Sequence, residues 1–172
     1  MGSPTVASLF VQRVVIGVGD LAVSNSQVVL STYALGSCVG IVAYDPFLRV
    51  GGLLHVMLPD SKIAPEKAAA HPAMFADTGL AQFFHELGTF KASAARLRIF
   101  LAGGASVISG SDPFRIGERN ALAVAAGLSA RGLRPHASEL GGSINRTVHL
   151  DLTTGRLTLK TPRGDSEYDL AG

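Results

Sequence analysis

Short apolar runs separated by turn-forming residues recur along the chain, and two of these runs are apolar on both faces of a strand. They cover residues 38–44 and 50–58, and the segment between them, residues 45–49, begins with Asp-Pro. Because Asp and Pro favour tight turns, this pattern predicts a β-hairpin. Strands that are apolar on both faces belong to a sheet that is covered on both sides.

Hydrophobic periodicity predicts further strands and two helices. The strands are expected over residues 11–19, 20–26, 28–33, 97–102, 133–140, 146–152 and 156–161. Apolar residues recur at helical spacing over 72–87, with Pro72 at the first position and Gly88 after the last. A second helix is expected over 116–130. Since strands outnumber helices, the predicted fold class is a layered α/β sandwich of mainly antiparallel or mixed sheet with two main helices.

The chain reads as a single domain over residues 1–172, with its core over 10–161. It has no internal repeat and no linker rich in Pro, Gly or Ser, and its length fits one well-filled core. The Gly- and Ser-rich residues 103–114 predict a flexible loop beside a cleft. The polar residues 162–172 predict a frayed C-terminal tail.

Composition and charge narrow the classes of function. Apolar residues make up 47% of the chain and charged residues 16%, as in a compact globular protein. The net charge of +2 gives no argument for binding nucleic acid. No segment approaches the roughly 20 uninterrupted apolar residues of a membrane helix, so we expect no membrane insertion. One cysteine fits a reducing compartment, and we expect a cytoplasmic protein.

Cys38 is the single cysteine, so it cannot form an internal disulfide and cannot build a zinc site by itself. It is either a buried apolar side chain or a nucleophile. We expect the hairpin turn to be centred between Pro46 and Phe47. In that register Cys38 lies directly opposite His55, with Cβ atoms roughly 4.5–5.5 Å apart. A slip of one residue would put the two side chains on opposite faces.

A cysteine and a histidine at this separation can act as nucleophile and general base. The imidazole takes the thiol proton, which gives a thiolate–imidazolium pair, and later returns the proton to a leaving amine. The backbone N–H groups of Gly36, Ser37 and Cys38 are candidates for an oxyanion hole. Thr32 is the nearest upstream hydroxyl of a type suited to orient the imidazole of His55.

Other motifs do not fit metal or cofactor chemistry. The glycines of residues 103–111 suggest a phosphate cradle, but no Gly-Lys-Ser/Thr follows them. His85-Glu86 starts like a metalloprotease helix, but Thr89 stands where the second histidine is required. We therefore expect no metal and no cofactor.

Several blocks together resemble the CheD family of bacterial chemotaxis. The early blocks are Leu35-Gly36-Ser37-Cys38-Val39-Gly40, Asp45-Pro46 and Gly51-Gly52-Leu53-Leu54-His55-Val56-Met57-Leu58-Pro59. The later ones are Ala76-Asp77-Thr78-Gly79-Leu80, Ala102-Gly103-Gly104-Ala105, Ile116-Gly117-Glu118-Arg119-Asn120, Gly141-Gly142-Ser143-Ile144-Asn145-Arg146-Thr147-Val148 and Asp151-Leu152-Thr153-Thr154-Gly155. They span residues 28–160 in the expected order.

The resemblance implies a chemoreceptor glutamine deamidase on an α/β sandwich, with an active site like that of glutamine-deamidating bacterial toxins. The family's nucleophile matches Cys38, its histidine matches His55, and its threonine or serine matches Thr32. The implied substrates are glutamines of chemoreceptors, the methyl-accepting chemotaxis proteins, converted to glutamate through a thioester. The family also implies hydrolysis of glutamate methyl esters and a phosphatase partner, CheC. The chain departs from the family at residues 143–145, where receptor docking would be affected.

Two other interpretations stay open. A non-catalytic adaptor would bind a receptor or a phosphatase through its surface, with Cys38 buried and inert. A different amidohydrolase would act on a small-molecule amide. The joint presence of Thr32, Cys38 and His55 favours the protein-glutamine deamidase over the adaptor.

Overall fold

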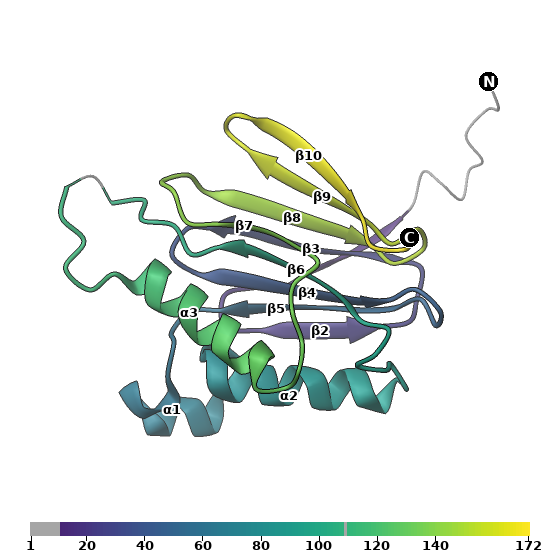
Figure 1. Ribbon diagram of the computed structural model, residues 1–172, viewed down its shortest axis with the longest axis horizontal. Coiled ribbons are helices and arrows are strands. Elements are labelled where there is room, and N and C mark those ends of the chain that lie inside the picture. Colours follow the sequence, from purple (N-terminus) through teal and green to yellow (C-terminus); the bar gives the residue numbers. More distant parts are fainter. Residues whose placement is uncertain (1–10, 109) are drawn as a thin grey trace.

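The protein is built of three layers, in which two β-sheets stack face to face and helices cover the far side of one sheet (Figure 1). The computed structural model describes residues 11–108 and 110–172. The central sheet has the order β2 (Leu21–Ser24), β5 (Val50–Val56), β4 (Val39–Asp45), β6 (Arg98–Gly103) and β7 (Ala137–Leu140). The outer sheet has the order β1 (Gln12–Val15), β3 (Val28–Leu35), β8 (Arg146–Asp151), β9 (Arg156–Thr161) and β10 (Gly164–Asp169). The pairs β1–β3 and β6–β7 are parallel and the others antiparallel, which confirms the predicted α/β sandwich of mainly antiparallel, mixed sheet.

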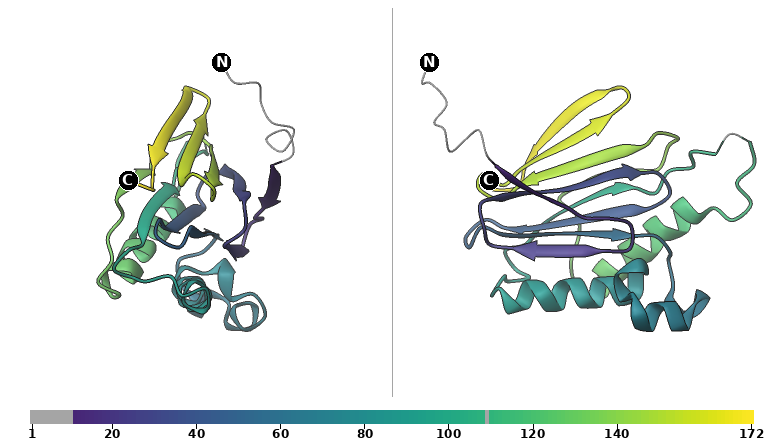
Figure 2. Two further views of the ribbon diagram at one scale, coloured as in Figure 1. Left: turned by 90° about the vertical axis from the view of Figure 1, so that its right-hand side faces the viewer. Right: turned by 180° about the vertical axis from the view of Figure 1, so that it is seen from behind.

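The helices lie on one side of the central sheet, which α2 and α3 contact directly. They are η2 (Ser61–Ile63), α1 (Pro65–Ala70), η3 (Pro72–Met74), α2 (Ala76–Thr89) and α3 (Ile116–Ser129), where η denotes a 3-10 helix. In Figure 2 (left) the strands are seen nearly end-on, with α2 and α1 below the sheets. The two longest helices, α2 and α3, are the two that the sequence predicts.

Each face of the central sheet buries its own apolar core. The core beneath α2 and α3 includes Val39, Ile41, Leu80, Phe83 and Val124. The core between the sheets includes Leu30, Val42, Leu53, Phe100 and Leu150. Both faces of β4 and β5 are therefore buried, as the doubly apolar sequence of these strands predicts.

Gly51 and Gly52 allow the central sheet to approach both neighbouring layers. A Cβ atom on Gly52 would lie 2.5 Å from Cε2 of Phe83, on the helix side. A Cβ atom on Gly51 would lie 2.3 Å from Cδ2 of Leu152, on the side of the outer sheet. A side chain at either position would require the side chain of Phe83 or of Leu152 to shift.

The β4–β5 hairpin is present, but its predicted register is wrong. Asp45 pairs with Val50, so the turn is centred between Phe47 and Leu48. The residue opposite His55 is therefore Gly40. The carboxylate of Asp45 accepts hydrogen bonds from the backbone N–H groups of Phe47, at 3.1 Å, and Leu48, at 3.4 Å. The centre of the turn is therefore one residue later in the chain than expected. The register differs by two positions, so Cys38 and His55 remain on the same face of the sheet. Only their relative position along the strands changes.

Two further boundaries differ from the prediction. Residues 72–87 do not form one helix, because Phe75 is extended (φ −114°, ψ 143°) between η3 and α2. The tail that the sequence predicts to fray contains β10, which pairs along its whole length with β9. Its backbone ladder orders a segment whose side chains are mostly exposed.

Candidate active site

The site begins with a contact between the two sheets. Thr32 lies on β3 of the outer sheet and His55 on β5 of the central sheet, and both side chains are buried. Oγ1 of Thr32 is 2.7 Å from Nδ1 of His55, and the same hydroxyl donates to the carbonyl oxygen of Ile16 at 2.7 Å. A hydroxyl has one proton to give, so Thr32 must accept from Nδ1. The contact therefore fixes the tautomer of His55, with its proton on Nδ1.

The other ring nitrogen of His55 is left free. Nε2 is buried and has no hydrogen-bond partner among the described residues. Burial lowers the pKa of His55 to about 4, because the interior penalises the charged imidazolium. The ring is consequently neutral at neutral pH, with an unprotonated Nε2 that can accept a proton.

Cys38 lies on the same face as His55 but is not directly opposite it. It immediately precedes β4 and packs against the core between the sheets, to which Leu53 of β5 also belongs. Since Gly40 is the residue opposite His55, Cys38 is the diagonal neighbour, a relation that separates residues by roughly 7–8 Å. The structure thus brings Thr32, Cys38 and His55 to one region, without a hydrogen bond between the sulfur and Nε2.

The thiol of Cys38 is half-buried. Burial raises its pKa, and the hydrogen bond from its own backbone N–H only partly offsets this. The unliganded site therefore favours a neutral thiol beside a neutral imidazole. This differs from the thiolate–imidazolium pair that the sequence predicts, because burial penalises both of those charges.

The segment of residues 36–38 is held by its carbonyl groups. The carbonyl oxygen of Gly36 accepts from the N–H of Ala105 at 2.8 Å, and that of Cys38 accepts from the N–H of Gly104 at 2.9 Å. The carbonyl oxygen of Ser37 accepts from Nδ2 of Asn120 at 2.9 Å.

These bonds orient the amides of the predicted oxyanion hole. In a trans peptide unit the C=O and the following N–H point in opposite directions. The N–H groups of Ser37 and Cys38 therefore point away from the partners that hold the preceding carbonyls. For Gly36 the bonds fix the carbonyl but not its own N–H.

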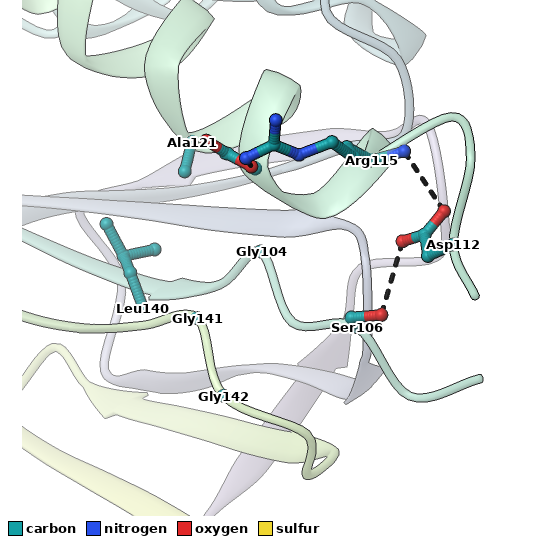
Figure 3. Close-up of a pocket in the computed structure, with 9 residues that line it drawn as sticks. Gly104, Ser106, Asp112, Arg115, Ala121, Leu140, Gly141 and Gly142 are labelled. Carbon is teal, nitrogen blue, oxygen red and sulfur yellow. Dashed lines mark hydrogen bonds and ion pairs between the residues drawn. The ribbon is translucent and has the colours of Figure 1, made fainter. Parts of the chain in front are cut away.

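The loop after β6 is partly fixed against residues 36–38, the candidate nucleophile segment. Besides the two bonds from Gly104 and Ala105, the N–H of Ser106 donates to the carbonyl of Gly142 at 2.9 Å. Farther along, Asp112 accepts from the hydroxyl of Ser106 at 3.2 Å and from the N–H of Arg115 at 3.0 Å (Figure 3). The predicted flexible loop of residues 103–114 is therefore anchored at its start.

A cavity of about 570 Å³ opens beside this loop and the start of α3 (Figure 3). It is lined by Gly104, Ser106, Asp112, Arg115, Glu118, Ala121, Leu140, Gly141 and Gly142. Neither Cys38 nor His55 lines it. It adjoins Gly104, whose N–H donates to the carbonyl of Cys38, but Thr32 does not line it either, so the cavity is separate from the three candidate site residues.

Asn120 is the residue of this region whose role the sequence does not reveal. It belongs to a block that resembles the CheD family, but a polar residue within a helix is most often exposed. Here it is fully buried, on the face of α3 that packs against the central sheet. Within the described residues, no group of three or more His, Cys, Asp and Glu side chains is placed to hold a metal.

The fold and the site define an α/β sandwich with a buried threonine–histidine pair beside a half-buried cysteine. The family model described as CheD chemotactic sensory transduction matches residues 57–161. Among curated proteins, the chain is 41% identical over 150 residues to a probable chemoreceptor glutamine deamidase CheD of Solibacter usitatus, which covers 87% of this chain and 89% of the relative. It is 44% identical over 149 residues to the protein of that name from Desulforamulus reducens, and the match covers 85% of this chain and 89% of the relative. A probable chemoreceptor glutamine deamidase CheD of Pyrococcus abyssi is 40% identical over 151 residues, which cover 87% of this chain and 91% of the relative.

These matches show that the chain belongs to the CheD family, as the resemblance of its sequence blocks predicts. The family model begins at residue 57, so Thr32, Cys38 and His55 precede the matched segment. Their assignment as a site rests on the geometry described above. No helix within the described residues is long and apolar enough to span a membrane.

Proposed function

We propose that the protein is a protein-glutamine deamidase that converts glutamines of chemoreceptors to glutamate. The observation that carries the proposal is the Thr32–His55 hydrogen bond of 2.7 Å, which leaves Nε2 of His55 unprotonated and free. A buried neutral imidazole with a fixed tautomer, close to a single cysteine, is the arrangement that a thiol nucleophile needs. The names of the relatives supply the substrate class, since those proteins are called probable chemoreceptor glutamine deamidases.

In the proposed mechanism His55 acts first as a general base. The Cys38 side chain turns about its Cα–Cβ bond toward Nε2, a rotation that its half-buried position permits. Nε2 takes the thiol proton as Sγ bonds to the carboxamide carbon of the glutamine. The N–H groups of Ser37 and Cys38 stabilise the resulting oxyanion, a contribution worth roughly 10²–10³ in rate for each donor.

The second half of the reaction returns every group to its starting state. The imidazolium of His55 gives its proton to the leaving nitrogen as the C–N bond breaks, which releases ammonia and leaves a thioester. Water then attacks the thioester as His55 takes a proton from it. The C–S bond breaks as His55 gives this proton to the sulfur, which yields glutamate and the free thiol of Cys38. A glutamate methyl ester would follow the same course, with methanol as the leaving group.

The partners follow from the same proposal. Receptors supply the glutamine side chain, and the phosphatase CheC is a second proposed partner. A lone free thiol is kept reduced in a cytoplasm, where the signalling domains of receptors are reached. Residues 143–145, which depart from the family pattern, lie next to the site, because Oδ1 of Asn145 is 3.0 Å from where a Cβ atom of Gly36 would be. A change of receptor preference is therefore expected from this segment.

The test is mass spectrometry of purified receptor, with ammonia release measured in parallel. The active protein should convert a set of receptor glutamines to glutamate, and Cys38→Ala and His55→Asn should abolish the conversion. Asn can keep a donor near the position of Nδ1, so His55→Asn removes the base at Nε2 with little change to the contact with Thr32.

The matched control is His85→Asn, an exposed position on α2, which should leave the rate unchanged. Ammonia release that continues undiminished in Cys38→Ala would overturn the proposal. Receptor binding without any conversion by the unmodified protein would favour the adaptor interpretation instead.

A further inference from the structure

Asn120 joins the two segments that carry the proposed nucleophile and base. Its Nδ2 group donates to the carbonyl of Ser37 and to the carbonyl of Met57, both at 2.9 Å. Ser37 directly precedes Cys38, and Met57 follows His55 by two residues. One side chain of α3 therefore bridges the start of β4 and the end of β5.

The bridge lies where the β4–β5 ladder ends. The last pair of the ladder is Val39 with Val56, and beyond it the N–H of Met57 donates to the carbonyl of Met74 at 2.8 Å. The two strands separate at this point, so no backbone bond ties residues 37 and 57 to each other. The carboxamide of Asn120 fills this place and makes both bonds.

Chemistry and burial fix the orientation of this carboxamide. Both partners are carbonyl oxygens, which only accept, so the NH₂ group must face them and Oδ1 must face away. Asn120 is 0% exposed, and its Oδ1 has no hydrogen-bond partner among the described residues. Burying an amide with an unsatisfied oxygen costs stability, so packing alone does not account for an amide here.

We infer that Asn120 is a positioning residue that aims the N–H of Cys38 at the oxyanion formed during acyl transfer. The inference rests on the proposed function in one respect, namely that Cys38 is acylated. Because Asn120 holds the carbonyl of Ser37, the N–H of Cys38 in the same peptide unit is turned to the opposite side, away from Asn120. Holding Met57 at the same time keeps the end of β5, and with it His55, at a fixed height relative to Cys38.

The inference separates two reactions of one thiol. Acylation of Cys38 by p-nitrophenyl acetate passes through a tetrahedral oxyanion, as Sγ bonds to the acetyl carbon and p-nitrophenolate leaves. Alkylation of Cys38 by iodoacetamide displaces iodide from a CH₂ group and forms no oxyanion. A residue that only supports the fold would change both rates in proportion, whereas one that aims an oxyanion donor changes acylation alone.

The experiment measures both rates in the whole protein and in Asn120→Leu, which keeps the approximate volume but has no donor. We expect the acylation rate of Asn120→Leu to fall about 10- to 100-fold, because the loss of one oxyanion donor costs about 10²–10³ in rate. The alkylation rate should stay within about twofold of that of the unmodified protein. Asn120→Asp, which keeps the shape and replaces the donor by an acceptor, should behave in the same way. Val124→Ala is the control, because Val124 is fully buried one turn along the same helix and belongs to the core beneath it.

Each outcome decides the inference. A lowered ratio of acylation to alkylation in both Asn120 variants, with the ratio of Val124→Ala unchanged, supports it. An unchanged ratio in the Asn120 variants overturns it. A ratio that falls only because alkylation rises also overturns it, since exposure of the Cys38 thiol on unfolding would speed alkylation. The ester probe needs no receptor, so this result does not depend on receptor deamidation. If the proposed substrate were wrong, receptor glutamines would stay unmodified while the ester result was unaffected.

Discussion

Thr32 and His55 are joined by a 2.7 Å hydrogen bond that crosses from the outer sheet to the central sheet. The position of the imidazole therefore depends on how the two sheets stack, and not only on the strand that carries it. Because the hydroxyl also donates to the carbonyl of Ile16, the threonine is itself held by the backbone segment that follows β1. Three separate parts of the chain thus determine which ring nitrogen is free.

Replacing Thr32 by valine should slow catalysis and weaken the fold. Valine has nearly the same shape but cannot accept from Nδ1, so the ring loses its fixed tautomer and the carbonyl of Ile16 loses a donor. We expect the rate constant of glutamine conversion to fall at least about tenfold, as for other groups that orient a reactive histidine. Leaving buried polar groups unpaired should lower the free energy of unfolding by about 1–3 kcal/mol.

Steady-state kinetics and urea unfolding of Thr32→Val check both parts. Thr147→Val is the control, since Thr147 is half-buried and alternates with the buried Val148 on β8. It should be close to neutral in both measurements. A Thr32→Val protein with full activity would show that His55 does not need the threonine.

The buried neutral state of His55 should make stability depend on pH. An unfolded histidine has a pKa of about 6.5, and the folded value is lowered to about 4 by burial. Between these values the unfolded chain binds a proton that the folded protein does not, so stability is lost as the pH falls through this window. The difference corresponds to about 3 kcal/mol of unfolding free energy at most.

Urea unfolding at a series of pH values from 7 down to 4 measures this dependence. In His55→Asn the slope between pH 6.5 and 4 should be smaller, because the titrating group is gone. His85→Asn, at an exposed position, should keep the slope of the unmodified protein. Equal slopes in all three proteins would contradict the buried neutral histidine.

The thiol of Cys38 should react slowly with alkylating agents when no substrate is bound. Burial raises its pKa, so its thiolate fraction at neutral pH is lower than that of an ordinary cysteine. We expect the rate of iodoacetamide alkylation at pH 7 to lie below that of N-acetylcysteine and to keep rising with pH beyond the ordinary thiol pKa. A rate that is already constant between pH 6 and 7 would instead show a thiolate–imidazolium pair.

The sequence predicts the hairpin because apolar runs and an Asp-Pro turn are local signals, but it does not predict the register. The residue that closes the turn with a positive φ is Arg49, at 54°, in a conformation for which glycine is the usual sequence signal. The carboxylate of Asp45 compensates by capping the loop. Because the resulting error is two positions, Cys38 and His55 still share a face, and the functional prediction does not depend on it.

Other features lack a local signal altogether. Asn120 is buried because α3 packs where β4 and β5 separate, a position that helical periodicity cannot indicate. β10 has no alternation of apolar and polar residues, and it is ordered by its ladder with β9. The Thr32–His55 contact joins residues on different sheets, so no local pattern indicates it. The sequence points to Thr32 only as the nearest upstream hydroxyl and through the resemblance to the CheD family.

Gly103 offers a sharp test of how the nucleophile segment is supported. Its φ is +111°, and a Cβ atom there would lie 2.1 Å from the carbonyl oxygen of Cys38. Gly110 is a matched control, because its φ is +105° but nothing lies within 4 Å of its Cβ position. Gly103→Ala and Gly110→Ala should therefore share the cost of an alanine at positive φ, about 1–3 kcal/mol.

Only Gly103→Ala adds a collision with the backbone, which must move Cys38 or β6. We expect Gly103→Ala to lower both the unfolding midpoint and the acylation rate of Cys38 well beyond Gly110→Ala. Equal effects of the two substitutions would mean that the contact between Gly103 and Cys38 does not hold the nucleophile in place.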